Sequence, residues 1–194
     1  MNERRNRMTA CRTAAAVVVS LVLALGSGCG GNDSGPGSVV PPGTCVDFTS
    51  AAAPSAGTVV ARKNATSSCD VLGVDLVVTD VADIFAVELT VEYDQAVVNY
   101  DGVGTSGSLL SSDGAGLQVI DGGQGGRTSV SISRFGVVTG IDAVGSQVLA
   151  TLIFRRPGAA GVSNLTFSGA DLFDSDAPPL PIAVQWFGGT FTVQ

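Results

Sequence analysis

Carboxylates are the only side chains in this chain with an obvious capacity for acid–base chemistry, because its 194 residues include no histidine. Without an imidazole, neither a Ser-His-Asp nor a Cys-His nucleophile can be assembled. A glycosidase needs two carboxyl groups at a set separation across a cleft. Glu88 and Glu92 are close in sequence, but on one strand they would lie about 13 Å apart, too far for either glycosidase geometry. We therefore expect no enzymatic activity.

A second pattern typical of a chemical site is the run of alternating aspartates in the segment DLFDSDAP, residues 171–178. A calcium loop of the EF-hand type would need a glycine at Ala177 and a ligand at Pro178, and it has neither. We expect a polar hairpin there instead. The glycine-rich segments 113–114 and 121–126 are predicted as turns, because a strand rather than a helix follows them. No metal and no cofactor are expected.

The four cysteines separate by position. Cys11 and Cys29 lie in the N-terminal thirty residues, which leaves Cys45 and Cys69 as the remaining pair. In an oxidising compartment such a pair most often forms a disulfide, here closing a loop of about 24 residues worth about 3 kcal/mol. Two cysteines without histidine do not make a zinc site. The enclosed segment, residues 46–68, is predicted to be weakly structured.

Residues 1–28 have the pattern of a bacterial lipoprotein signal. A basic start is followed by an apolar run over residues 14–25 and by Gly26-Ser27-Gly28-Cys29. Cys29 would then become the acylated N-terminus, anchored by lipid chains. Gly26 departs from the pattern, since leucine usually stands there. An ordinary secretory signal cut near Gly28 is the alternative, and the run is short for a membrane span, which needs about 20 residues. The basic residues of the start are Arg4, Arg5, Arg7 and Arg12.

Residues 29–44 are rich in Gly, Ser and Pro and are predicted to be a flexible tether. Because Gly30 rather than aspartate follows Cys29, we expect the outer membrane of a Gram-negative bacterium as the location. Removing residues 1–28 takes away four of the ten basic side chains and one of the seventeen acidic side chains. Six basic and sixteen acidic side chains remain, so the net charge is near −10. Such an acidic chain excludes nucleic acid and anionic lipid surfaces as partners, so the lipid on Cys29 is the only expected membrane contact.

The elements that must position any site are strands. In FAVELTVEYD, residues 85–94, apolar residues occupy every second position, as in a half-buried strand. Similar blocks separated by Gly, Asp and Pro turns predict an all-β sandwich with one core over residues 45–194. The predicted strands cover residues 58–62, 73–81, 85–92, 97–100, 117–120, 128–133, 147–154, 163–168, 182–187 and 189–193.

In their order and spacing these blocks resemble the cohesin domain, most clearly over residues 57–194. The matching features are Tyr93-Asp94 after the alternating strand, the segment GSLL at 107–110, LATLIF at 149–154, and the closing GTFTV. Gln95 stands where the family often has proline, and Ala86 where it often has glycine, which indicates a divergent member. The resemblance implies a jelly-roll β-sandwich of about nine strands and a receptor for a dockerin-bearing protein in trans.

In cohesins the dockerin lies across one sheet face, so the resemblance directs attention to outward residues of the strands at 85–92 and 128–133. The same residues could equally be ordinary solvent-facing positions. Carbohydrate binding is the alternative function on this fold, for which Trp186 and Phe187 are the only aromatic candidates, although alternation predicts Trp186 in the core. A structural envelope component is a third alternative. The candidate binding face comprises Ala86, Glu88, Thr90, Ser129, Ser131 and Ser133.

Overall fold

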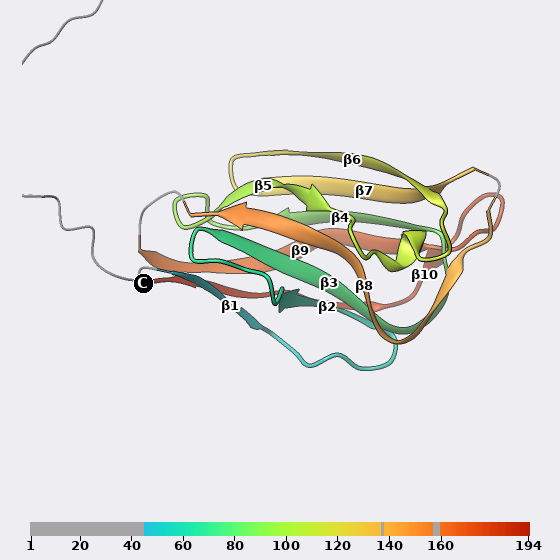
Figure 1. The fold of residues 1–194 in the computed structure, drawn as a ribbon, viewed down its shortest axis with the longest axis horizontal. Helices are drawn as coiled ribbons and strands as arrows, with labels where there is room; N and C mark the ends of the chain where they lie inside the picture. The colour runs from blue at the N-terminus through green and yellow to red at the C-terminus, as the bar shows by residue number, and fades with distance from the viewer. Residues whose placement is uncertain (1–44, 137, 157–159) are drawn as a thin grey trace, which may run out of the picture. The chain divides into compact units, whose positions relative to one another are not determined.

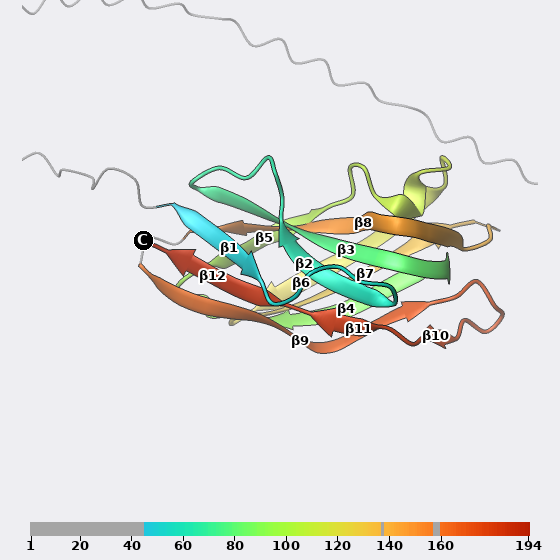
Figure 2. The same ribbon diagram turned by 90° about the horizontal axis from the view of Figure 1, so that it is seen from below.

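The computed structural model describes residues 45–136, 138–156 and 160–194. Cys29, the predicted signal and the whole of the predicted tether lie outside the described residues. The described chain is a sandwich of two sheets, which Figure 2 shows edge-on as two layers. This confirms the predicted all-β class.

One layer is a seven-stranded antiparallel sheet. Its main order is β1-β12-β9-β4-β7-β6, and β10 pairs with β9 beside this path. The strands β9, β4, β7 and β6 run side by side, and β6 forms the edge of the sheet (Figure 1). The bounds are β1 (Val46–Ser50), β12 (Gly189–Val193), β9 (Gly161–Phe173), β4 (Ala86–Glu92), β7 (Arg127–Phe135), β6 (Gly116–Gln124) and β10 (Pro181–Ile182).

The other layer is a five-stranded sheet of order β11-β2-β3-β8-β5. All its pairings are antiparallel except that of β11 with β2. A short 3-10 helix, η1 (Leu109–Ser111), lies between β5 and β6 in sequence and buries both of its leucines. The bounds of the strands are β11 (Gln185–Phe187), β2 (Thr58–Lys63), β3 (Val71–Ile84), β8 (Ile141–Arg155) and β5 (Asn99–Gly104).

The core forms where the inward residues of both layers meet. Val87, Leu89 and Val91 of β4 are buried, whereas Glu88 and Glu92, on the alternate positions, are exposed, as the alternation predicts. The ring of Phe154 from β8 lies 4.7 Å from that of Phe191 in β12, so aromatic packing joins the two layers. All members of the core cluster lie within residues 46–193, so the described domain carries a core of its own.

The predicted disulfide is present and joins Cys45 to Cys69. Cys45 immediately precedes β1 at the edge of the seven-stranded sheet, and Cys69 lies in the turn between β2 and β3 of the other sheet. The Val46 amide also donates to the Cys69 carbonyl oxygen at 3.3 Å. The bond therefore ties the first strand of one layer to a hairpin of the other.

Several predicted boundaries were wrong. The segment 46–68 is not weakly structured, because it contains β1 and β2. Residues 121–124 belong to β6 and residues 171–173 to β9, and only the residues after them form turns. The predicted strand 182–187 is divided between β10 and β11, which belong to different sheets. The strand predicted at 97–100 begins instead at Asn99 and runs to Gly104.

Candidate functional site

The six predicted face residues form three directly facing pairs on β4 and β7. Ala86 lies opposite Ser133, Glu88 opposite Ser131, and Thr90 opposite Ser129. Their neighbours in the two strands, such as Val87 and Val130, are buried in the core, so the six side chains point to the outer surface of the seven-stranded sheet.

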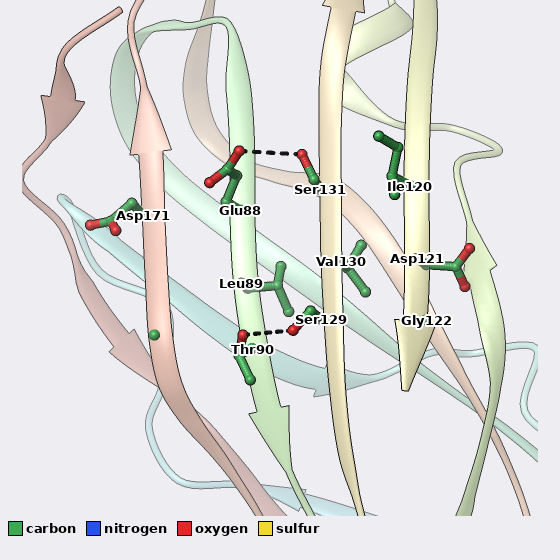
Figure 3. Close-up of a pocket in the computed structure, with 11 residues that line it drawn as sticks. Glu88, Leu89, Thr90, Ile120, Asp121, Gly122, Ser129, Val130, Ser131 and Asp171 are labelled. Atoms are coloured by element: carbon green, nitrogen blue, oxygen red, sulfur yellow. Dashed lines mark hydrogen bonds between the residues drawn. The ribbon is translucent and has the colours of Figure 1, made fainter. Parts of the chain in front are cut away.

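Hydrogen bonds connect two of the pairs across the strands. The hydroxyls of Thr90 and Ser129 share a hydrogen bond of 2.9 Å. The Ser131 hydroxyl donates to Oε1 of Glu88 at 3.5 Å (Figure 3). These cross-strand contacts fix the polar side chains close to the sheet and keep the surface flat.

The registers of β9 and β6 extend these three pairs, and the further pair Glu92 and Arg127, into four rows of four residues perpendicular to the strands. Each row takes one residue from β9, β4, β7 and β6 in that order. Row 1 is Phe173, Ala86, Ser133 and Gln118; row 2 is Asp171, Glu88, Ser131 and Ile120; row 3 is Gly169, Thr90, Ser129 and Gly122; row 4 is Thr166, Glu92, Arg127 and Gln124.

A shallow recess of about 620 Å³ lies over rows 2 and 3. Row 3 is low because glycines stand at both of its ends, Gly169 and Gly122, and a Cβ atom added at either would meet no atom within 4 Å. Row 2 forms a wall of the recess, with carboxylates at one end and Ile120, 63% exposed, at the other (Figure 3). The recess is open, and its lining mixes the hydroxyls of Thr90 and Ser129 with apolar atoms, a form suited to the surface of another macromolecule.

Asp171 and Ile120 belong to this recess, but sequence reasoning did not place them there. Asp171 was weighed only as part of a calcium loop, and position 120 was predicted only as the end of a strand. β9 continues to Phe173, and this continuation brings Asp171 directly opposite Glu88. Ile120 stands between Val119 and Asp121, so no apolar–polar alternation marked which side of this edge strand it would face.

The strand that carries Ile120 is held in place from the other layer. The Tyr100 hydroxyl of β5 donates to Oδ2 of Asp121 at 2.9 Å. In Figure 3 the Asp121 carboxylate points away from Ser131 and Glu88. Burial of Tyr100, reinforced by this hydrogen bond to a carboxylate, raises the pKa of the phenol well above its ordinary value.

The expected polar hairpin begins only after Asp171, which belongs to β9, and there Asp174 serves turn geometry as predicted. Oδ1 of Asp174 accepts from the amides of Asp176 and Leu180, which closes the turn between β9 and β10. In the described part of the chain, no three His, Cys, Asp or Glu side chains are grouped so that they could hold a metal ion. Within the same residues, no helix has the length and apolar character to cross a membrane.

Both aromatic candidates for sugar binding, Trp186 and Phe187, are half-buried. Trp186 is partly buried, packs against the core cluster, and lies with its ring 5.1 Å from that of Phe167. Its neighbour in register is the fully buried Val59 of β2. Trp186 therefore packs against the core, as predicted, but it lies at the margin of the core.

No protein-family model matches the chain, and no curated protein matches it. Comparison with solved structures, in contrast, shows that the described domain is a cohesin-like β-sandwich. The type II cohesin dyad from the adaptor ScaA scaffoldin of Acetivibrio cellulolyticus matches with a TM-score of 0.54 at 16% identity, over 70% of this chain and 48% of that one.

Two further structures complete the comparison. A complex of CaCohA2 with a CaDoc0917 variant gives a TM-score of 0.51 at 18% identity, over 64% of this chain and 90% of that one. A non-cellulosomal cohesin from the archaeon Archaeoglobus fulgidus matches with a TM-score of 0.46 at 14% identity, over 75% of this chain and 88% of that one. At identities of 16% and 18%, the two matches with TM-scores above 0.5 establish the fold alone, and this agrees with the resemblance recognised in the sequence.

Proposed function

We propose that the described domain is a non-catalytic protein-binding module whose partner, a separate protein, binds the outer face of β9, β4, β7 and β6. The observation that carries this proposal is the assembly of Ala86, Glu88, Thr90 and their three facing serines into one flat, polar surface. A flat surface with hydroxyl groups and a shallow recess fits a protein surface better than it fits a small molecule, which usually occupies a deep apolar pocket.

The cohesin resemblance makes a dockerin-type protein the first candidate for the partner. Polysaccharide is a weaker candidate, because Trp186 is half-buried and packs against Phe167, whereas sugar sites usually show two or three exposed aromatic side chains on one face. No reaction is proposed, since the chain has no histidine and the carboxylates on this face lack the enclosed cleft that catalysis requires.

The experiment is affinity capture from a detergent extract of the source cells by immobilised residues 45–194, with and without a calcium chelator. One protein should be retained by the wild-type domain and lost with the double variant Glu88→Arg/Ser131→Arg. The control is Asp70→Arg/Ser106→Arg, which makes the same change in charge at exposed positions in turns beside the other sheet. The proposed function would be rejected if both double variants retained the protein equally. It would also be rejected if the domain retained no protein and bound only to insoluble polysaccharide.

We further propose that Cys29 is acylated and holds the domain at the cell envelope, in the outer membrane. The support is the sequence pattern of residues 1–29 and the tether-like composition that follows. Labelled palmitate should be incorporated into the full-length chain and into Cys11→Ala, but not into Cys29→Ala. Incorporation into Cys29→Ala would contradict this anchor.

A further inference from the structure

The strand β6 ends the seven-stranded sheet with one of its two sides unpaired. Among the described residues it pairs only with β7, and this pairing is uninterrupted over all nine residues, Gly116–Gln124 (Figure 1). In an antiparallel sheet, every second residue of such an edge directs its N–H and C=O groups outward, where a further strand can bind them. The edge of β6 is therefore a template for the addition of a strand.

β6 lacks the features that protect the other sheet edges from such pairing. β1 and β11 have only five and three residues, and a bulge interrupts β5 between Tyr100 and Gly102. Proteins also protect long edges with lysine or proline, and β6 contains neither. Its one charged residue, Asp121, accepts the hydrogen bond from Tyr100 that holds the strand in place. β6 is thus a long, ordered and weakly charged edge.

The sequence of β6 is complementary to itself in the antiparallel orientation. A two-fold axis beside Ile120 would pair all nine residues with those of a second copy, whereas any other centre leaves strand ends unpaired. Ile120, 63% exposed, would then pack against its own copy. Gln118 would lie opposite Gly122, where a Cβ atom would meet nothing within 4 Å. Asp121 would lie opposite Val119, so no like charges would face each other directly.

We infer that the domain forms a symmetric dimer in which the β6 strands of two copies pair antiparallel, centred on Ile120, and join their seven-stranded sheets into one. About eight to ten backbone hydrogen bonds would cross this interface. The contact is smaller than a standard protein interface, and two acidic chains repel each other. We therefore expect a dissociation constant on the order of 100 µM that falls as salt rises. The dimer does not depend on the function proposed above.

Sedimentation velocity of residues 45–194, which contain the whole described core, measures this dimer. The dimer fraction should rise between about 10 µM and about 1 mM protein, and between about 50 mM and about 500 mM salt. Ile120→Lys places two lysines opposite each other and should weaken the dimer about tenfold. The matched control is Val144→Lys, which makes the same change in charge at a residue of β8 that is 79% exposed. It should dimerise like the wild type.

Cysteine variants test the register, because residues 45–194 contain no cysteine outside the disulfide. Directly opposite residues of an antiparallel pair have Cβ atoms about 5 Å apart, close to the disulfide range, whereas residues displaced by four positions lie about 13 Å apart. Ile120→Cys should therefore oxidise rapidly to a covalent dimer. Gln118→Cys and Gly122→Cys should each crosslink slowly alone and rapidly when the two variants are mixed.

Dimerisation lost in Ile120→Lys, kept in Val144→Lys and accompanied by this crosslinking pattern would establish pairing at β6 in the stated register. A domain that stays monomeric up to about 1 mM would overturn the dimer and leave the edge to a strand of another protein. Equal dimerisation of the two lysine variants would contradict the interface. Crosslinking of Gln118→Cys alone as fast as the mixed pair would contradict the register.

Discussion

The hydroxyl of Tyr100 donates a hydrogen bond of 2.9 Å to the carboxylate of Asp121, and this contact links the edge strands of the two sheets. β5 ends the five-stranded sheet, and β6 ends the seven-stranded sheet on the same side of the sandwich. Within its sheet β6 pairs with β7 on one side and has no strand on the other. Ile120 lies next to Asp121 in β6. The position of Ile120, at the apolar end of the proposed binding face, thus depends on a side chain from the opposite layer.

Tyr100→Phe should therefore loosen β6. Loss of the hydroxyl is expected to lower the free energy of unfolding by about 1 kcal/mol and to speed hydrogen exchange of the β6 amides. Tyr93→Phe is the control, because its hydroxyl contacts Thr128 of β7, which is paired on both sides. Equal exchange of β6 in both variants would show that Tyr100 does not hold this edge.

Alkaline pH should destabilise the domain through the same tyrosine. In the unfolded chain the phenol loses its proton near its ordinary pKa of 10.0, whereas in the folded chain burial and Asp121 raise that pKa well above this value. Above pH 10 the unfolded state therefore binds fewer protons, and stability falls as pH rises. Denaturation between pH 9 and about 11 should show a steeper fall for the wild type than for Tyr100→Phe.

Acid should act through Asp113. Oδ2 of this residue accepts a hydrogen bond of 2.5 Å from the buried guanidinium of Arg134, and this bond lowers the pKa of the carboxyl below its ordinary 3.8. The contribution is present above that value and is lost as pH falls through the lowered pKa. Asp113→Asn should be less stable than the wild type at pH 7, and the difference should shrink toward pH 2. A constant difference would contradict this role.

The disulfide should stabilise the domain by restricting the unfolded chain. Cys45 and Cys69 are separated by 24 residues, so the double variant Cys45→Ser/Cys69→Ser should unfold with a free energy lower by about 3 kcal/mol. Urea titration gives the value, and wild-type domain under strong reductant should match the variant. A variant as stable as the oxidised wild type would show that the cross-link does not contribute.

Alternation was enough to predict the central part of the face. Val87, Leu89 and Val91 fix which side of β4 faces the core, and Val130 and Ile132 do the same for β7, so Glu88 and Ser131 had to point outward. Their direct opposition depends on the register of β4 with β7, which only the structure gives.

Irregular strands explain most of what sequence reasoning missed. β3 extends to Ile84 through two register shifts, where Asp80 and Asp83 adopt positive φ values of 49° and 55°. Aspartate tolerates a positive φ, but the sequence alone does not show which aspartates adopt one. β1 was missed because its pairing with β12 joins the two ends of the domain, a long-range contact with little local signal beyond VDF.

The central claim is that a protein binds the outer face of β9, β4, β7 and β6, and site-specific photocrosslinking in the source cells tests it most directly. The photoreactive residue benzoylphenylalanine would replace Ser131 in one version of the full-length chain and Ser106, at the opposite sheet, in another. We predict one discrete crosslinked protein from position 131 and none from position 106. Crosslinking of the same protein from both positions, or from position 106 alone, would contradict the claim.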